Sequence, residues 1–223
     1  MAVLAMLAFA ACTNAPDSDK ATTSEAKEVA ATSGEAWKVD ATASKVEWIG
    51  TKVTGYHSGV VPVKSGELTV ADGTITGGRF VMDMNAMLVT GPKGSDAESN
   101  NKLLGHLKSA DFFEVSAHPE ATFVLTGVKP FTGTVSEEND PRQEDISKYK
   151  VSNPTHTVSG NLTIKGVTRN IEFPARITVS GNTVDALAKF NIDRSQWNIV
   201  YPGQPDDLIR NDIHLGIALK ASR

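Results

Sequence analysis

Apolar and polar residues alternate with a period of two through most of the chain after residue 37. Such alternation predicts strands that bury one face, and short turn signals such as Asp72-Gly73 and Ser180-Gly181-Asn182 separate the runs. About eight runs can be distinguished, together with one or two short helices. Antiparallel strands with one apolar face are typical of a β-sandwich or a β-barrel, so the fold class is all-β.

The two architectures differ in what fills the interior. Two packed sheets form a dry core, whereas an eight-stranded barrel can hold one small ligand. The inward residues are mostly unbranched or aromatic, and methionines adapt to irregular shapes, but alternation alone leaves both architectures open. The residues predicted to line the interior, and to bind a ligand if the barrel is hollow, are Trp48, Phe80, Met82, Met84, Phe123, Leu125, Leu162, Ile164, Phe173, Phe190, Ile192 and Trp197.

The stretch 103–125 interrupts the alternation. Three leucines between residues 103 and 107 share one helical face, and the helical pattern breaks at Ser109. The adjacent Phe112 and Phe113 need an apolar surface to pack against. We therefore expect a short helix that covers one end of the sheet structure, with the two phenylalanines pinning it there.

A few polar residues fall where the pattern expects interior ones. The alternation points Lys52 inward, so either the strand bends at Gly50 and turns Lys52 outward, or Lys52 and His57 line a polar part of a cavity. At residues 193–197 we expect a bend at which Arg194 pairs with a carboxylate while Trp197 closes over the interior. Lys52, His57 and Arg194 are thus candidates for a polar mouth.

Composition and motifs exclude several function classes. The net charge is −4 with a pI of about 5.7, and no basic cluster is present, which argues against binding to nucleic acid. No nucleophile elbow, zinc motif or phosphate-binding glycine loop occurs, and the five histidines are scattered. We predict no catalytic residues, no metal site and no cofactor. The acidic stretch 134–148 reads as a solvated hairpin extension rather than a calcium loop.

The N-terminus carries a separate signal. Residues 2–11 form a small apolar run that ends at Cys12, too short to span a bilayer but typical of a secretory signal. The run resembles a bacterial lipoprotein signal, which predicts export, lipidation at Cys12 and a membrane anchor in the periplasm or outer membrane. An ordinary secretory signal with an incidental cysteine is the alternative. Residues 13–35 contain no aromatic residue and only Val29 as a large aliphatic one, so we predict a flexible tether before the folded domain, 36–223.

Three blocks in fixed order carry a resemblance to a known family. They are HLKSADFFEVSAHPEATF (106–123), GNLTIKGVTRNIEF (160–173) and FNIDRSQWNI (190–199). Together they resemble the YceI-like polyisoprenoid-binding family over residues 37–221. The resemblance implies an extended, lipocalin-like, eight-stranded antiparallel barrel in an exported protein. It also implies non-catalytic binding, storage or transport of a long-chain isoprenoid lipid or isoprenoid quinone inside the barrel.

Two departures from the family pattern leave the ligand open. The stretch 51–68 is more polar than the second strand of many members, and the acidic insertion near 137–145 is long. Two other functions remain as alternatives. One is a surface-exposed interaction or stress-related module with a filled barrel, and the other is an enzyme that acts on a bound lipid through His57 and Lys52. The ligand, the oligomeric state and the membrane leaflet are not determined by the sequence.

Overall fold

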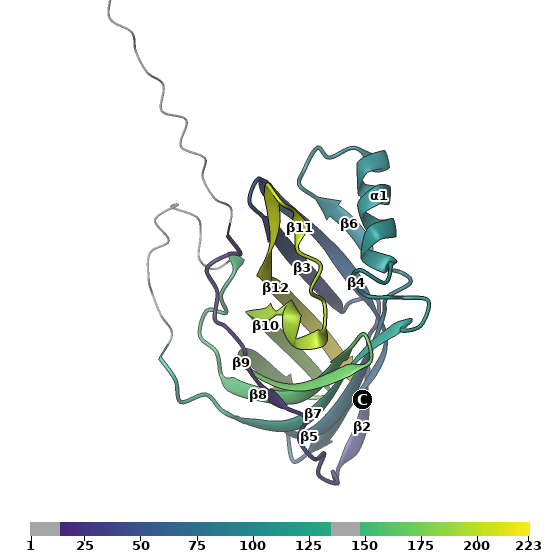
Figure 1. Ribbon diagram of the computed structural model, residues 1–223. Helices are drawn as coiled ribbons and strands as arrows, with labels where there is room; N and C mark the ends of the chain where they lie inside the picture. The colour runs from purple at the N-terminus through teal and green to yellow at the C-terminus, as the bar shows by residue number, and fades with distance from the viewer. Residues whose placement is uncertain (1–13, 135–147) are drawn as a thin grey trace, which may run out of the picture.

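Eight long strands close into an antiparallel barrel in the computed structural model, which describes residues 14–134 and 148–223 (Figure 1). Strand β3 pairs with both β4 and β12 and so closes the ring, and every pairing around the ring is antiparallel. The ring strands are β3 (Lys45–Lys52), β4 (Gly55–Ala71), β5 (Thr74–Asp83), β7 (Glu120–Pro130), β8 (His156–Ile164), β9 (Val167–Ser180), β10 (Thr183–Asp193) and β12 (Asp207–Ser222). The predicted barrel is confirmed and the sandwich alternative is wrong.

Short strands extend this ring. β6 (Leu88–Gly91) pairs with β4, and β11 (Gly203–Gln204) forms a hairpin with β12. β2 (Glu35–Val39) pairs with β4 and β12 beyond the end of β3, where those two strands would otherwise separate. β2 therefore completes the wall at the lower end of Figure 1, where Trp37 and Val39 are buried.

Over residues 14–134 and 148–223 the structure has two complete helices of three residues or more, in line with the predicted one or two. α1 (Ala97–Lys108) starts at Asp96, whose side chain accepts a hydrogen bond from the Ser99 N–H at 2.8 Å. It ends at Ser109, as the sequence predicts, because the Ser109 hydroxyl bonds back to the His106 carbonyl. The single-turn η2 (Arg194–Trp197) follows β10. α1 lies beside β6 at the upper end of the barrel in Figure 1.

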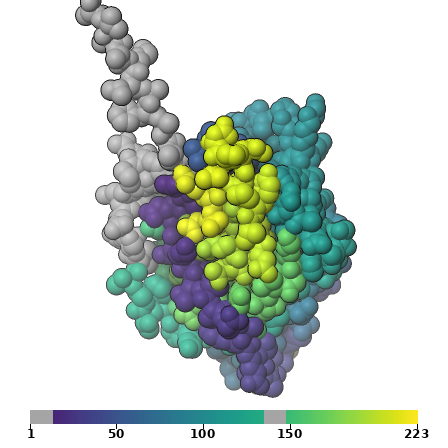
Figure 2. All heavy atoms as spheres, in the orientation of Figure 1, coloured from purple at the N-terminus to yellow at the C-terminus, as the bar shows by residue number. Residues whose placement is uncertain are grey.

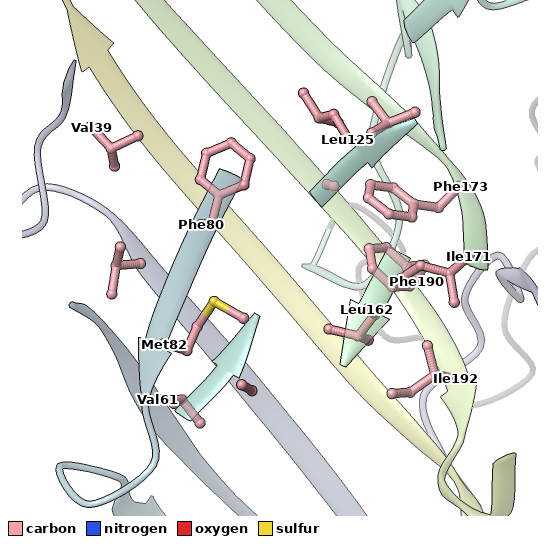
Figure 3. Packing of buried hydrophobic residues seen from close by; sticks show 14 of the residues in the cluster. Val39, Val61, Phe80, Met82, Leu125, Leu162, Ile171, Phe173, Phe190 and Ile192 are labelled. Carbon is pink, nitrogen blue, oxygen red and sulfur yellow. The ribbon is translucent and has the colours of Figure 1, made fainter. Parts of the chain in front are cut away.

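The interior faces of the strands follow the predicted alternation. Of the twelve predicted interior residues, Trp48, Phe123 and Ile164 are partly buried and the other nine are buried. Phe173 and Phe190 stack with ring centroids 4.0 Å apart, and Phe123 lies 5.9 Å from Phe173. Figure 3 shows Phe173 and Phe190 on the other side of the interior from Phe80 and Met82 of β5.

Part of the stretch predicted as a flexible tether, residues 14–25, packs along the barrel wall. β1 (Thr22–Glu25) pairs with β9, and the Ala21 N–H donates to the Asn191 carbonyl of β10 at 2.9 Å. β9 and β10 pair with each other only up to Ala175 and Ala188, so beyond that point β1 supplies the missing partner of β9. Figure 2 shows this N-terminal wedge, residues 14–25 in purple, running down one face beside the yellow C-terminal part of the chain.

The physical reason lies in the backbone. The wedge has few large apolar side chains, but unpaired backbone groups at a strand edge need partners whatever the side chains are. Polar anchors add to the pairing: the Asn191 side chain donates to the Pro16 carbonyl at 2.9 Å, and the Asn161 side chain exchanges two hydrogen bonds with the backbone of Lys27. Cys12 and most of the acidic stretch, 135–147, lie outside the described residues.

Candidate functional site

A cavity of about 390 Å³ occupies the end of the barrel under α1. Its volume falls within the range of small-molecule pockets, roughly 300–1,000 Å³. The wall is mostly apolar and combines residues of β3, β5, β8, β10, β12, α1 and η2. Of the predicted interior residues, those that line this upper cavity are Trp48, Met82, Met84, Leu162, Ile164, Ile192 and Trp197. The barrel is therefore hollow in its upper part.

A second cavity of about 130 Å³ lies deeper in the barrel. The two cavities are adjacent, because four side chains line both of them: Val46, Met82, Leu162 and Leu215. Figure 3 shows Met82 and Leu162 projecting into this shared interior. The predicted interior residues that line the lower cavity are Phe80, Met82, Phe123, Leu125, Leu162, Phe173 and Phe190. All twelve thus line one cavity or the other, and their contact with a ligand stays a prediction.

The predicted polar mouth is brought together, since Lys52, His57 and Arg194 all line the upper cavity. Lys52 points inward rather than being turned outward at Gly50. It avoids an unpaired charge because its Nζ forms an ion pair with Asp207 Oδ2. The other oxygen of Asp207 accepts hydrogen bonds from the Thr54 N–H at 3.0 Å and the Thr54 hydroxyl at 2.9 Å. Lys52 and these bonds lower the pKa of Asp207.

Arg194 lies in the predicted place but not with the predicted partner. Its guanidinium donates to the backbone carbonyls of Ile199 at 2.8 Å, Arg210 at 3.2 Å and Ile209 at 3.5 Å. The expected pairing with a carboxylate is wrong because Asp193 caps η2 instead, accepting from the Ser195 N–H at 2.9 Å and hydroxyl at 2.6 Å. Burial lowers the pKa of Arg194, and the charge of Asp193 opposes that shift.

Trp197 faces the interior, where it lines the upper cavity. It is fully buried, and its indole N–H donates to the Leu162 carbonyl of β8 at 3.0 Å. Asn198 takes the left-handed conformation, with φ of 57°, and ends η2 directly after it. This turn lets the chain leave the barrel wall and continue toward Tyr201 and β11, which lie at the rim of the upper cavity.

Comparison with known proteins agrees with this geometry. A family model described as the YceI-like domain matches residues 37–221. The chain belongs to this family. UPF0312 proteins of Pectobacterium atrosepticum and Azotobacter vinelandii are 34% and 33% identical to it over 77 and 76 residues. Each match spans 34% of this chain and 29% of the relative, so the chain matches less than a third of the length of these relatives.

Solved structures share the YceI-like fold. BcnA of Burkholderia cenocepacia superposes with a TM-score of 0.60 at 18% identity, over 82% of this chain and 99% of BcnA. A polyisoprenoid-binding domain from Saccharophagus degradans, implicated in plant cell wall breakdown, gives a TM-score of 0.57 at 15% identity, over 83% of this chain and 97% of that domain. At these identities the likeness shows a common fold.

One part of this YceI-like cavity is not apparent from the sequence pattern. His106 of α1, Phe112 and Tyr201 form an aromatic cluster at the rim, with ring centroids 4.8 to 5.4 Å apart. Phe112 and Phe113 pack the end of α1 against the barrel and also line the cavity. Tyr201 lies in an irregular segment, where no periodicity could assign it to the interior.

Three polar atoms near the upper cavity are buried and lack a hydrogen-bond partner among the described residues. They are Trp48 Nε1, Thr51 Oγ1 and His57 Nδ1. Burial, and then the nearby charge of Lys52, lower the pKa of His57, so its imidazole is neutral at pH 7. Within residues 14–134 and 148–223, no group of three or more potential ligands could hold a metal ion. In the same residues no helix is long and apolar enough to cross a membrane.

Proposed function

We propose that this YceI-like barrel binds one long-chain apolar lipid, such as a polyisoprenoid or an isoprenoid quinone, and stores or carries it without chemical change. The observation that carries the proposal is the upper cavity of about 390 Å³, next to which a second apolar cavity shares part of the same wall. Family membership and the shared fold with a polyisoprenoid-binding domain point the same way. The hollow barrel disfavours the alternative of a filled interaction module.

Energetics favour reversible loading. Burying one five-carbon isoprenoid unit is worth roughly 2–4 kcal/mol relative to water, so even a short tail gives strong gross binding. Relative to a bilayer the gain is close to zero, because lipid tails are as apolar as the cavity wall. A barrel of this kind can therefore take up lipid at a membrane and return it there.

Export and anchoring belong to the same proposal. The apolar run before Cys12 supports an exported lipoprotein held at a bacterial membrane, where such a lipid is found. Because the wedge docks from Pro16 onward, such an anchor would leave only a short linker. The mass of the mature protein tests this point: a diacylglyceryl-modified N-terminal cysteine is expected, and an unmodified cysteine would contradict it.

Ligand binding can be measured through tryptophan fluorescence. Trp48 and Trp197 line the upper cavity, whereas Trp37 is buried in the lower wall outside both cavities. Titration of the delipidated full chain with a long-chain isoprenoid quinone should quench its fluorescence to a 1:1 endpoint. A Trp48→Phe variant should lose part of the quenching, and the matched Trp37→Phe control should keep the quenching of the cavity tryptophans. Absence of saturable quenching would refute the proposed function.

A further inference from the structure

We propose that the upper cavity selects lipids with an uncharged polar head over lipids with an anionic head, and that Asp207 enforces this selection. The inference rests on the proposed function and narrows the ligand class. Phosphate, diphosphate and carboxylate heads are bound in proteins by cations and charge-assisted donors that are free to reach them.

Only three charged side chains line the upper cavity in the described part of the chain: Lys52, Arg194 and Asp207. Lys52 is neutralised by its ion pair with Asp207. The Asp207 side chain is 17% exposed and Lys52 is 35% exposed, so the carboxylate is the more enclosed partner. An anionic head at this position would meet the Asp207 carboxylate together with the Lys52 ammonium and would gain little from the pair.

The hydrogen-bond donors of Arg194 are also already in use. The side chain is buried, and three of its N–H groups already bond to the carbonyls of Ile199, Ile209 and Arg210. These carbonyl oxygens surround the guanidinium with negative dipole ends, and Asp193 precedes it in the chain. The guanidinium thus serves to tie η2 to the start of β12, and it is poorly placed to compensate a second, incoming anion.

The remaining polar groups suit a neutral head. His57 is uncharged at pH 7 because burial lowers its pKa, and His106 Nε2 lies 2.9 Å from the Asp111 carboxylate. Tyr201 and Gln204 add a hydroxyl and an amide to the same rim. The Tyr201 hydroxyl and the Gln204 amide can donate to a carbonyl oxygen or exchange hydrogen bonds with a hydroxyl, as a quinone or an alcohol head requires.

The selection can be tested with two probes that share one tail, geranylgeraniol and geranylgeranyl diphosphate. Their affinities are compared for the full chain and for Asp207→Asn. Asparagine retains the oxygen that accepts from Thr54 and removes only the charge that faces Lys52. Asp212→Asn is the matched control, because Asp212 lies on the same strand, pairs with the exposed Lys20 and does not line the cavity.

The unmodified chain should bind the alcohol at least tenfold more tightly than the diphosphate. Asp207→Asn should raise the affinity for the diphosphate about tenfold relative to the affinity for the alcohol, because it frees Lys52. Asp212→Asn should change neither affinity. If Asp207→Asn does not fold, as judged by circular dichroism, Asp207→Ser removes the same charge and carries the same expectation.

Each negative result of this experiment contradicts a different part of the proposal. A preference of the unmodified chain for the diphosphate would overturn the selection but leave lipid binding in place. An unchanged diphosphate affinity in the folded Asp207 variant would overturn the role of Asp207. If neither probe binds and the quinone titration is also negative, the results contradict both the proposed function and this inference.

Discussion

At the scale of single residues, local competition decided which polar groups took which partners. Asp193 and Arg194 are adjacent and opposite in charge, which suggested a carboxylate partner for the arginine. The Asp193 carboxylate instead reaches the Ser195 N–H and hydroxyl, where it caps η2. Arg194 then turns to three carbonyls. Sequence spacing places both residues at the bend. It does not tell whether the Asp193 carboxylate will cap the helix or pair with the arginine.

Another residue, His214, gives the barrel a dependence on pH. It is 4% exposed, and its Nδ1 lies 3.0 Å from Asn191 Oδ1. The amide nitrogen of the same Asn191 side chain donates to the Pro16 carbonyl of the N-terminal wedge. Burial lowers the pKa of His214 to about 4, with a smaller contribution from Lys189 and an opposing one from Glu47. The folded state therefore disfavours the imidazolium, whereas the unfolded chain accepts the proton near pH 6.5.

This linkage fixes the sign of the effect. Stability from neutral His214 is fully present above pH 6.5 and is lost as the pH falls toward 4, because the unfolded chain binds the proton first. Between pH 7.5 and pH 5 the loss should be about 2 kcal/mol. Urea unfolding at both pH values measures it, and His214→Gln should show a correspondingly smaller loss. An equal loss in the variant would show that other groups, such as His57, are responsible.

At the scale of elements, the side-chain pattern predicted the features that depend on side-chain packing, namely the inner faces of the strands and the helix α1. The period of two assigned the inner faces of the ring strands, and the leucines near residue 103 together with Ser109 predicted α1 and its end. The wedge was missed because backbone pairing at the exposed edge of β9 holds it, and backbone groups are the same in every sequence. The rim residue Tyr201 was missed because it lies between elements.

Two substitutions that replace an alanine with aspartate test whether the N-terminal wedge packs against the barrel. Ala21 is 5% exposed and packs with the core, whereas Ala30 is exposed in the same N-terminal segment. Ala21→Asp should lower the free energy of unfolding by about 2–4 kcal/mol, because it buries a charge without a partner. Ala30→Asp should change it by less than about 0.5 kcal/mol. Equal, small effects in urea unfolding would show instead that the segment is a loose tether.

At the scale of the whole molecule, the barrel is hollow near α1 and more tightly packed below. Met82 and Leu162 lie between the upper cavity of about 390 Å³ and the lower one of about 130 Å³, which the stacked Phe173 and Phe190 help to line. Alternation identified the residues that face the interior but could not reveal that they leave space. The closing of the ring and its filling depend on packing in three dimensions, which a one-dimensional pattern does not contain.

The two cavities predict a limit on tail length. Ala188 lines the lower cavity, and Ala188→Phe should fill it while leaving the upper cavity open. The variant should keep binding prenols short enough for the upper cavity and should lose at least tenfold in affinity for long ones. Ala36→Phe, on the exposed side of β2, is the control. Competition between short and long prenols measures the effect, and an unchanged preference would show that tails do not enter the lower cavity.

The central claim is that the barrel interior carries one long-chain lipid. Native mass spectrometry of the full chain, purified without detergent from a bacterium that makes isoprenoid lipids, tests it most directly. The expected spectrum shows a 1:1 adduct that dissociates on collisional activation and whose mass matches an uncharged isoprenoid lipid. A spectrum of the bare chain alone, which stays unchanged after incubation with an isoprenoid quinone or a long-chain prenol, would contradict the claim.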